Sequence, residues 1–144
     1  MHALAHTIGG RFHTPHGIAN AMIMPYVLDF YGKDVYPQLA RLAVVSGLGD
    51  KSEGDAILAE RFKARIKEMH AQFKMPTFVK GLSVSDAESV ATRALQEAHG
   101  ELHSPFWAPA SYWADAGYPL PKYMTQEECE AIVRNLVQQP ASRL

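Results

Sequence analysis

The chain contains one cysteine, Cys129, which excludes a framework of disulfide bonds within it. It has no run of about eighteen apolar residues, and no charged stretch followed by an apolar core as in a secretory signal. With 14 basic and 15 acidic side chains, the net charge is −1, which provides no basic surface for nucleic acid or an anionic membrane. We therefore expect a compact cytoplasmic unit of 144 residues, with no nucleic-acid or membrane partner.

No segment alternates apolar and polar residues with a period of two, so no strand is predicted. Apolar residues recur at helical spacing over 16–30, 35–48, 57–73, 85–98 and from 125 to Pro140. Two capping boxes, Ser85-Asp86-Ala87-Glu88 and Thr125-Gln126-Glu127-Glu128, are expected to begin the last two helices. The predicted fold class is all-α, a helical bundle.

Prolines and glycines punctuate these helices. Pro25 should kink the first or end a segment of it, and Gly47 and Gly49 should close the second. The third, 57–73, carries one apolar stripe made of Leu58, Phe62, Ile66, Met69 and Phe73. Its other face is charged, and we expect it to be solvated rather than to bind a partner; it consists of Glu60, Arg61, Lys63, Arg65, Lys67 and Glu68.

Four of the seven histidines lie within the first seventeen residues. His2 and His6 are four apart, so on a helix they project from the same face. Gly9-Gly10 should break that helix, and Pro15 suits the entry to the next one. His16 is then a loop histidine that a tight turn could place over His2.

Two readings of this cluster stand side by side. A histidine pair at i, i+4 is often an accident of composition, whereas imidazoles delivered by two helical elements are a common way to build a metal site. The spacing argues against a metalloprotease, because Ala3 stands where the zincin pattern needs a glutamate.

The same residues carry a family resemblance. They are the run from His2 to His6, Gly9, the run Pro15-His16-Gly17-Ile18-Ala19-Asn20-Ala21, and Met24-Pro25-Tyr26-Val27. This pattern resembles the signature of the iron-dependent (group III) alcohol dehydrogenases, HxxAHxxGxxxxxPHGxxNAxxLPxV. Met24 replaces a leucine of similar volume. The resemblance fits the alcohol dehydrogenases better than the related dehydroquinate-synthase and glycerol-dehydrogenase branches.

The resemblance implies a role for three histidines. His2 and His16 would be metal ligands, and His6 would lie beside the nicotinamide and substrate and relay a proton; His13 receives no role. The metal, Fe2+ by family or Zn2+ by donor chemistry, would act as a Lewis acid on an alcohol whose hydride passes to NAD or NADP. The implied function is an oxidoreductase that interconverts small alcohols with aldehydes or ketones.

The departures from the family concern what precedes the motif. Two further metal ligands and the nucleotide-binding domain lie upstream in the family, and neither a GxGxxG nor a GxxxxGK[ST] loop occurs here. Residues 1–144 are therefore expected to be the C-terminal helical part of such a dehydrogenase, truncated on its N-terminal side and inactive alone. We expect it to form a homo-oligomer or to lack its N-terminal half. The alternative is a non-catalytic helical module that acts by association with a partner chain.

The stretch 100–123 is rich in proline and aromatic residues, including both tryptophans. Such composition argues against disorder, and a loop of this length is uncommon without a function. It is either an irregular cover over the helical core or a lid or subunit contact. His99 and His103, which lie at its start, are expected to be surface histidines.

Overall fold

The computed structural model describes residues 1–98 and 121–138. All of the elements in this part of the chain are helical, as predicted. They divide into two compact units, one of 1–23 with 76–144 and the other of 24–75. The division falls inside helix α2 (His16–Tyr31). The aromatic stretch predicted at 100–123 and the histidines 99 and 103 lie almost entirely outside the described residues.

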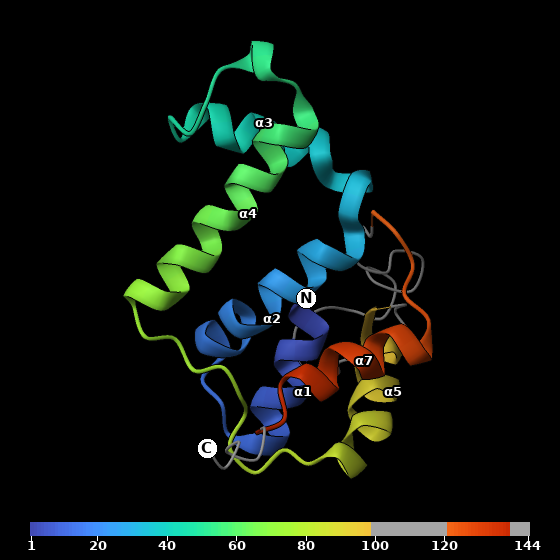
Figure 1. Ribbon diagram of the computed structural model, residues 1–144. Helices are drawn as coiled ribbons and strands as arrows, with labels where there is room; N and C mark the ends of the chain where they lie inside the picture. The colour runs from blue at the N-terminus through green and yellow to red at the C-terminus, as the bar shows by residue number, and fades with distance from the viewer. Residues whose placement is uncertain (99–120, 139–144) are drawn as a thin grey trace, which may run out of the picture. The chain divides into compact units, whose positions relative to one another are not determined.

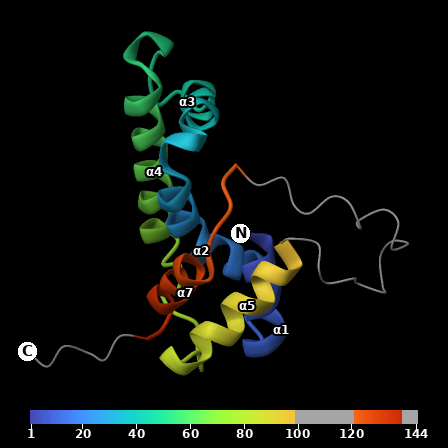
Figure 2. The same cartoon turned by 90° about the vertical axis from the view of Figure 1, so that its right-hand side faces the viewer.

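The first unit is built on helices α1 (His2–Phe12), α5 (Ala87–Ala98) and α7 (Gln126–Asn135). Figures 1 and 2 show α5 lying beside both α1 and α7. The buried residues of α5 recur at helical spacing, and three of the four are alanine, which lets helices approach closely: Ala87, Val90, Ala91 and Ala94. Helix α1 buries small residues and Ile8, which is fully buried.

Helix α1 continues through Gly9-Gly10 to Phe12, so the predicted break at the glycine pair is wrong. Each glycine costs helix stability of about 0.5–1 kcal/mol, but tertiary packing of an apolar face outweighs local propensity. A Cβ on Gly9 would lie 3.1 Å from the Thr14 carbonyl oxygen, so this glycine admits a close approach of the returning chain. The helix ends instead at His13, whose φ of 54° is left-handed.

Helix α5 is preceded by the short 3-10 helix η3 (Val84–Asp86), and the capping box lies there. The Asp86 carboxylate accepts hydrogen bonds from the Ser83 backbone N–H at 3.0 Å and the Ser83 hydroxyl at 2.5 Å. The box predicted at Ser85 and Glu88 is therefore wrong by two residues. The sequence pattern fits both, but Arg11 also binds Asp86, at 2.7 Å, which favours the earlier position.

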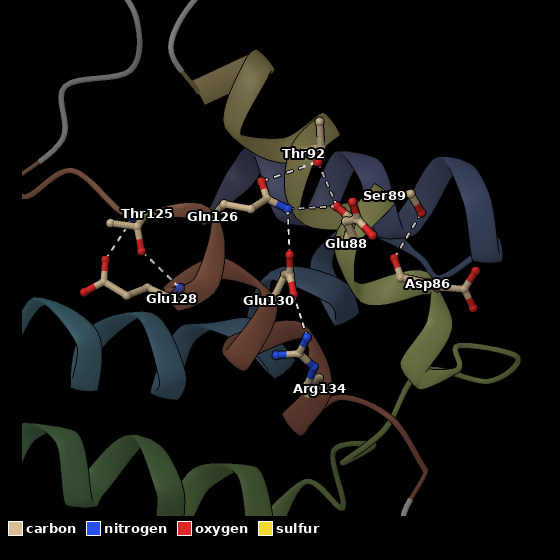
Figure 3. Close-up of polar contacts among 9 residues, drawn as sticks. All are labelled: Asp86, Glu88, Ser89, Thr92, Thr125, Gln126, Glu128, Glu130 and Arg134. Atoms are coloured by element: carbon tan, nitrogen blue, oxygen red, sulfur yellow. Dashed lines mark hydrogen bonds and ion pairs between the residues drawn. The ribbon is translucent and has the colours of Figure 1, made fainter.

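The capping box predicted for α7 is confirmed. The Thr125 hydroxyl accepts from the Glu128 N–H at 3.2 Å, and the Glu128 carboxylate accepts from the Thr125 N–H at 2.9 Å (Figure 3). Gln126 then joins α7 to α5 by donating to the Glu88 carbonyl oxygen at 3.1 Å. These bonds fix the start of α7 against α5.

The second unit packs α3 (Tyr36–Val45) against α4 (Asp55–Gln72). Helix α3 follows the 3-10 helix η1 (Gly32–Val35) and ends in a Schellman motif, in which Gly47 and Leu48 donate to the Val44 and Ala43 carbonyl oxygens. Gly47 has a φ of 69°, the left-handed conformation typical of a glycine that ends a helix, as predicted for this residue. A second short 3-10 helix, η2 (Lys51–Glu53), precedes α4. Two apolar clusters fill the space between α3 and α4, around Ala59 and Leu58.

Helix α2 covers the predicted 16–30 and keeps Pro25 inside it, so of the two predicted effects of this residue the helix does not end there. Helix α4 differs from its prediction at two places. On α4, Phe73 of the predicted apolar stripe follows the last helical residue and is 73% exposed. Lys63, predicted to be solvated, is buried, because its ammonium pairs with Asp29 and Glu60.

Candidate functional site

The candidate site lies where α1 and α2 begin. His2 and His6 stand one turn apart on α1, and the left-handed His13 reverses the chain toward α2. The Pro15 carbonyl accepts the Ala19 N–H at 2.9 Å, so Pro15 does open α2 as predicted. His16 is the first residue of α2 rather than a loop residue.

Three imidazoles are brought together here. The ring centroids of His2 and His16 are 5.6 Å apart, those of His6 and His16 are 5.0 Å apart, and those of His2 and His6 are 6.3 Å apart. All three residues are exposed. His13, the fourth histidine of the opening run, has no ring contact with them in the described structure.

The electrostatics of the cluster favour a neutral His2. Partial burial lowers the pKa of its imidazole, and the nearby positive charges of the Met1 amino group, His16 and His6 lower it further. Neutral imidazole is the form that binds metal ions. His2 therefore offers a donor nitrogen over a wider pH range than an isolated histidine does.

His16 and His6 each have a side-chain hydrogen-bond partner outside the histidine cluster. The Asn20 amide nitrogen lies 3.0 Å from His16 Nε2 and 3.1 Å from the His16 carbonyl oxygen. The Asn20 Oδ1 atom is buried and has no hydrogen-bond partner among the described residues. His6 Nδ1 lies 2.5 Å from Glu97 Oε1 on α5. Such outer partners orient imidazole rings and set their tautomers.

The donors present fit part of a metal site. Imidazole nitrogens suit iron and zinc, which is consistent with His2 and His16 as ligands. Within 1–98 and 121–138, however, no group of three or more His, Cys, Asp or Glu side chains could hold a metal ion. Cys129 is no substitute, because burial raises the pKa of its thiol to about 12. Catalytic metal sites usually have three protein ligands, so the described residues supply at most part of such a set.

The hydrogen-bond partners of His6 and His16, which are Glu97 and Asn20, were not identified from the sequence as site residues. Glu97 had a readable signal, since it follows Ala94 by three and Val90 by seven and so interrupts the apolar stripe of α5 with a charge. Asn20 had one as well, since it is a fixed position of the family signature and stands four residues after His16 on one helical face.

The structure defines an all-helical unit with a cluster of three histidines, and the comparisons give its family. Residues 1–137 match the C-terminal region of the Fe-containing alcohol dehydrogenase family. The chain belongs to that family.

Several relatives are alcohol dehydrogenases. The chain is 31% identical over 87 residues to an NADPH-dependent butanol dehydrogenase of Clostridium saccharobutylicum, which covers 60% of this chain and 22% of the relative. It is 32% identical over 83 residues to a 1-propanol dehydrogenase of Citrobacter freundii, with coverages of 56% and 22%. The chain thus spans about a fifth of the length of the curated relatives it matches.

The fold has a solved counterpart. A crystal structure of 1,3-propanediol oxidoreductase superposes with a TM-score of 0.71 at 24% identity, over 94% of this chain and 31% of that one. This likeness confirms the helical fold predicted from the resemblance.

Proposed function

We propose that this chain is the C-terminal catalytic part of a metal-dependent, NAD(P)-linked alcohol dehydrogenase that interconverts small alcohols with aldehydes or ketones. The observation that supports the proposal is the convergence of His2, His6 and His16 from two helices, in a chain that belongs to the family. The cytoplasm is the compartment in which we place it.

Each histidine has its own proposed task. His2 and His16 would donate imidazole nitrogens to a divalent metal, Fe2+ or Zn2+. When bound, the metal would supply Lewis acidity toward the substrate oxygen, and NAD or NADP the hydride chemistry. His6 would accept the hydroxyl proton during alcohol oxidation and return it in the reverse direction. The three rings lie close enough to serve one substrate atom.

Nucleotide binding and the remaining metal ligands are not assigned to any residue of 1–144 in this proposal. With two of the proposed ligands and no phosphate loop, the isolated chain would be inactive and would bind metal weakly. It would work with the N-terminal half of a dehydrogenase, or in a homo-oligomer. The alternative is a non-catalytic helical module that associates with a partner.

A chimera tests the proposal. Residues 1–137 would replace the matching C-terminal segment of the 1,3-propanediol dehydrogenase of Klebsiella pneumoniae, a relative that is 29% identical over 93 residues. We expect the chimera to reduce NAD or NADP with small alcohols, while the isolated chain gives no absorbance rise. A folded chimera without turnover would favour the non-catalytic module. Turnover by the purified isolated chain would contradict the proposed division of labour.

A further inference from the structure

The His6 imidazole is held from a second helix. His6 Nδ1 on α1 and Glu97 Oε1 on α5 are 2.5 Å apart, although the residues are 91 positions apart in the sequence. Glu97 is the more enclosed partner, with 23% of its side chain exposed against 43% for His6. In this contact the Glu97 carboxylate is therefore the less exposed group and the His6 imidazole the more exposed one.

The backbones that carry the pair are fixed. Ala5 precedes His6 on α1 and is fully buried, and Ala94 lies one turn before Glu97 on α5 and is 2% exposed. Helices α1 and α5 pack against each other. A side chain presented by packed helices has a better defined position than one presented by a loop. The carboxylate consequently meets the ring at a set place, on Nδ1.

A carboxylate at Nδ1 determines which ring nitrogen carries the proton. An ionised carboxylate accepts hydrogen bonds and cannot donate them, so Nδ1 must hold a hydrogen. In neutral His6, Nε2 then has the free lone pair. The same carboxylate stabilises the imidazolium that forms when Nε2 takes a proton, as the buried aspartate does in serine-protease triads.

We propose that Glu97 is a positioning residue that holds His6 in its Nδ1–H tautomer and leaves Nε2 as the nitrogen that exchanges protons with the substrate. This rests on the proton-relay role proposed for His6. In alcohol oxidation the hydroxyl proton passes to Nε2 and then to water, while the Glu97 carboxylate keeps accepting the hydrogen bond from Nδ1–H. No assignment from the family motif reaches this residue, because Glu97 lies outside the run from His2 to Val27.

The tautomer is measurable in the metal-free chain. Long-range 1H–15N spectra of the 15N-labelled chain, with chelator at about pH 8.5, report which nitrogen of a neutral imidazole is protonated. A His6→Ala spectrum identifies the signals of His6. We expect the Nδ1–H pattern at His6 in the wild type, a result that needs no Glu97 variant to fold.

Two variants test whether Glu97 determines the tautomer of His6. Glu97→Ala should move His6 away from the Nδ1–H pattern, since water has no preference for that nitrogen. Glu88→Ala is the matched control, an exposed glutamate on the same helix, and should leave the pattern unchanged. An ion pair that water reaches contributes little to stability, and Glu97 is only partly buried, so Glu97→Ala should keep its amide dispersion.

The outcomes separate the two proposals. A wild-type His6 with the proton on Nε2, or a Glu97→Ala spectrum like that of the wild type, would overturn the role of Glu97. Neither result depends on metal, nicotinamide or turnover, so the proton-relay role of His6 is judged separately by activity in the chimera.

Discussion

The Lys63 ammonium on α4 lies 2.7 Å from the Asp29 carboxylate on α2, with 10% of the Lys63 side chain exposed. Glu60 binds the same ammonium at 2.9 Å, and the Tyr36 hydroxyl donates to Glu60 at 2.8 Å. A residue on the charged face of α4 thus belongs to a polar network of the second unit, in which Lys63 is buried and the two carboxylates are about half exposed. Networks of this kind are sensitive to loss of one member.

Lys63→Ala should destabilise the chain by about 1–3 kcal/mol, mainly because it removes a packed aliphatic stem; the two carboxylates that lose their cation are about half exposed and add little. Lys67→Ala is the control: Lys67 lies 3.3 Å from Asp29, but its side chain is 57% exposed. Its loss should cost about 0–1 kcal/mol. Urea unfolding of the three proteins measures both values, and equal losses would show that burial of Lys63 has no effect.

The ion pair of Asp29 and Lys63 predicts that acid lowers the stability of the fold. Burial alone would raise the pKa of Asp29, but hydrogen bonds and charge from Lys63, with those from Lys67, outweigh burial and hold the pKa below its ordinary value. A carboxyl whose pKa is lower in the folded state stabilises the fold above its unfolded pKa of about 3.9, and that stability disappears as the pH falls through the folded pKa.

We therefore expect the free energy of unfolding to fall as the pH is lowered from about 5 to about 3, and to fall less steeply in Asp29→Asn. Denaturant titrations at several pH values give the two slopes. Parallel slopes would mean that Asp29 titrates alike in the folded and unfolded chains.

The Thr125 cap of α7 offers a second stability test. Thr125→Ala removes the hydroxyl that accepts from the Glu128 N–H, seen in Figure 3, and should cost about 0.5–2 kcal/mol. Glu127→Ala, an exposed change in the same turn, should stay within about 0.5 kcal/mol. A Thr125→Ala protein as stable as the Glu127→Ala protein would show that the capping box does not stabilise α7.

Helix positions could be predicted from the sequence because burial imposes the helical period directly. The first and last residues of a helix could be predicted only where capping hydrogen bonds between neighbouring residues determine them, as at Gly47 and Thr125. Gly9-Gly10 did not end α1, because burial of Ile8 against neighbouring helices outweighs a local preference. Ser85 did not begin α5, because Arg11, distant in sequence, binds Asp86.

The candidate site, like the helices, could be predicted from the sequence only where local spacing decides it. The spacing of His2 and His6 and the turn at Pro15 placed His16 near His2, as found. The partner of His6 was not predictable, because Glu97 lies 91 residues away and reaches His6 only through the packing of α5 on α1. Contacts that depend on tertiary packing leave only indirect traces in a single sequence, such as a charge on an apolar stripe.

In the active chimera, His6→Ala should lower kcat by a factor on the order of 10²–10⁴, the usual contribution of a general acid–base group, and leave metal content near normal. One limb of the pH–rate profile should disappear with it. His70→Ala on α4 is the matched histidine control and should change neither value. A His6→Ala chimera with full kcat would remove His6 from the proton path.

The most direct test of the central claim is zinc binding by the metal-free chain and its histidine variants, measured by calorimetric titration. With His2 and His16 as the only proposed ligands present, we expect binding far weaker than in a full-length relative. Binding should be abolished by His2→Ala and by His16→Ala, and retained in His6→Ala. Tight one-to-one binding by the wild type, or loss of binding in His6→Ala, would make His6 a ligand and contradict the roles assigned to the three histidines.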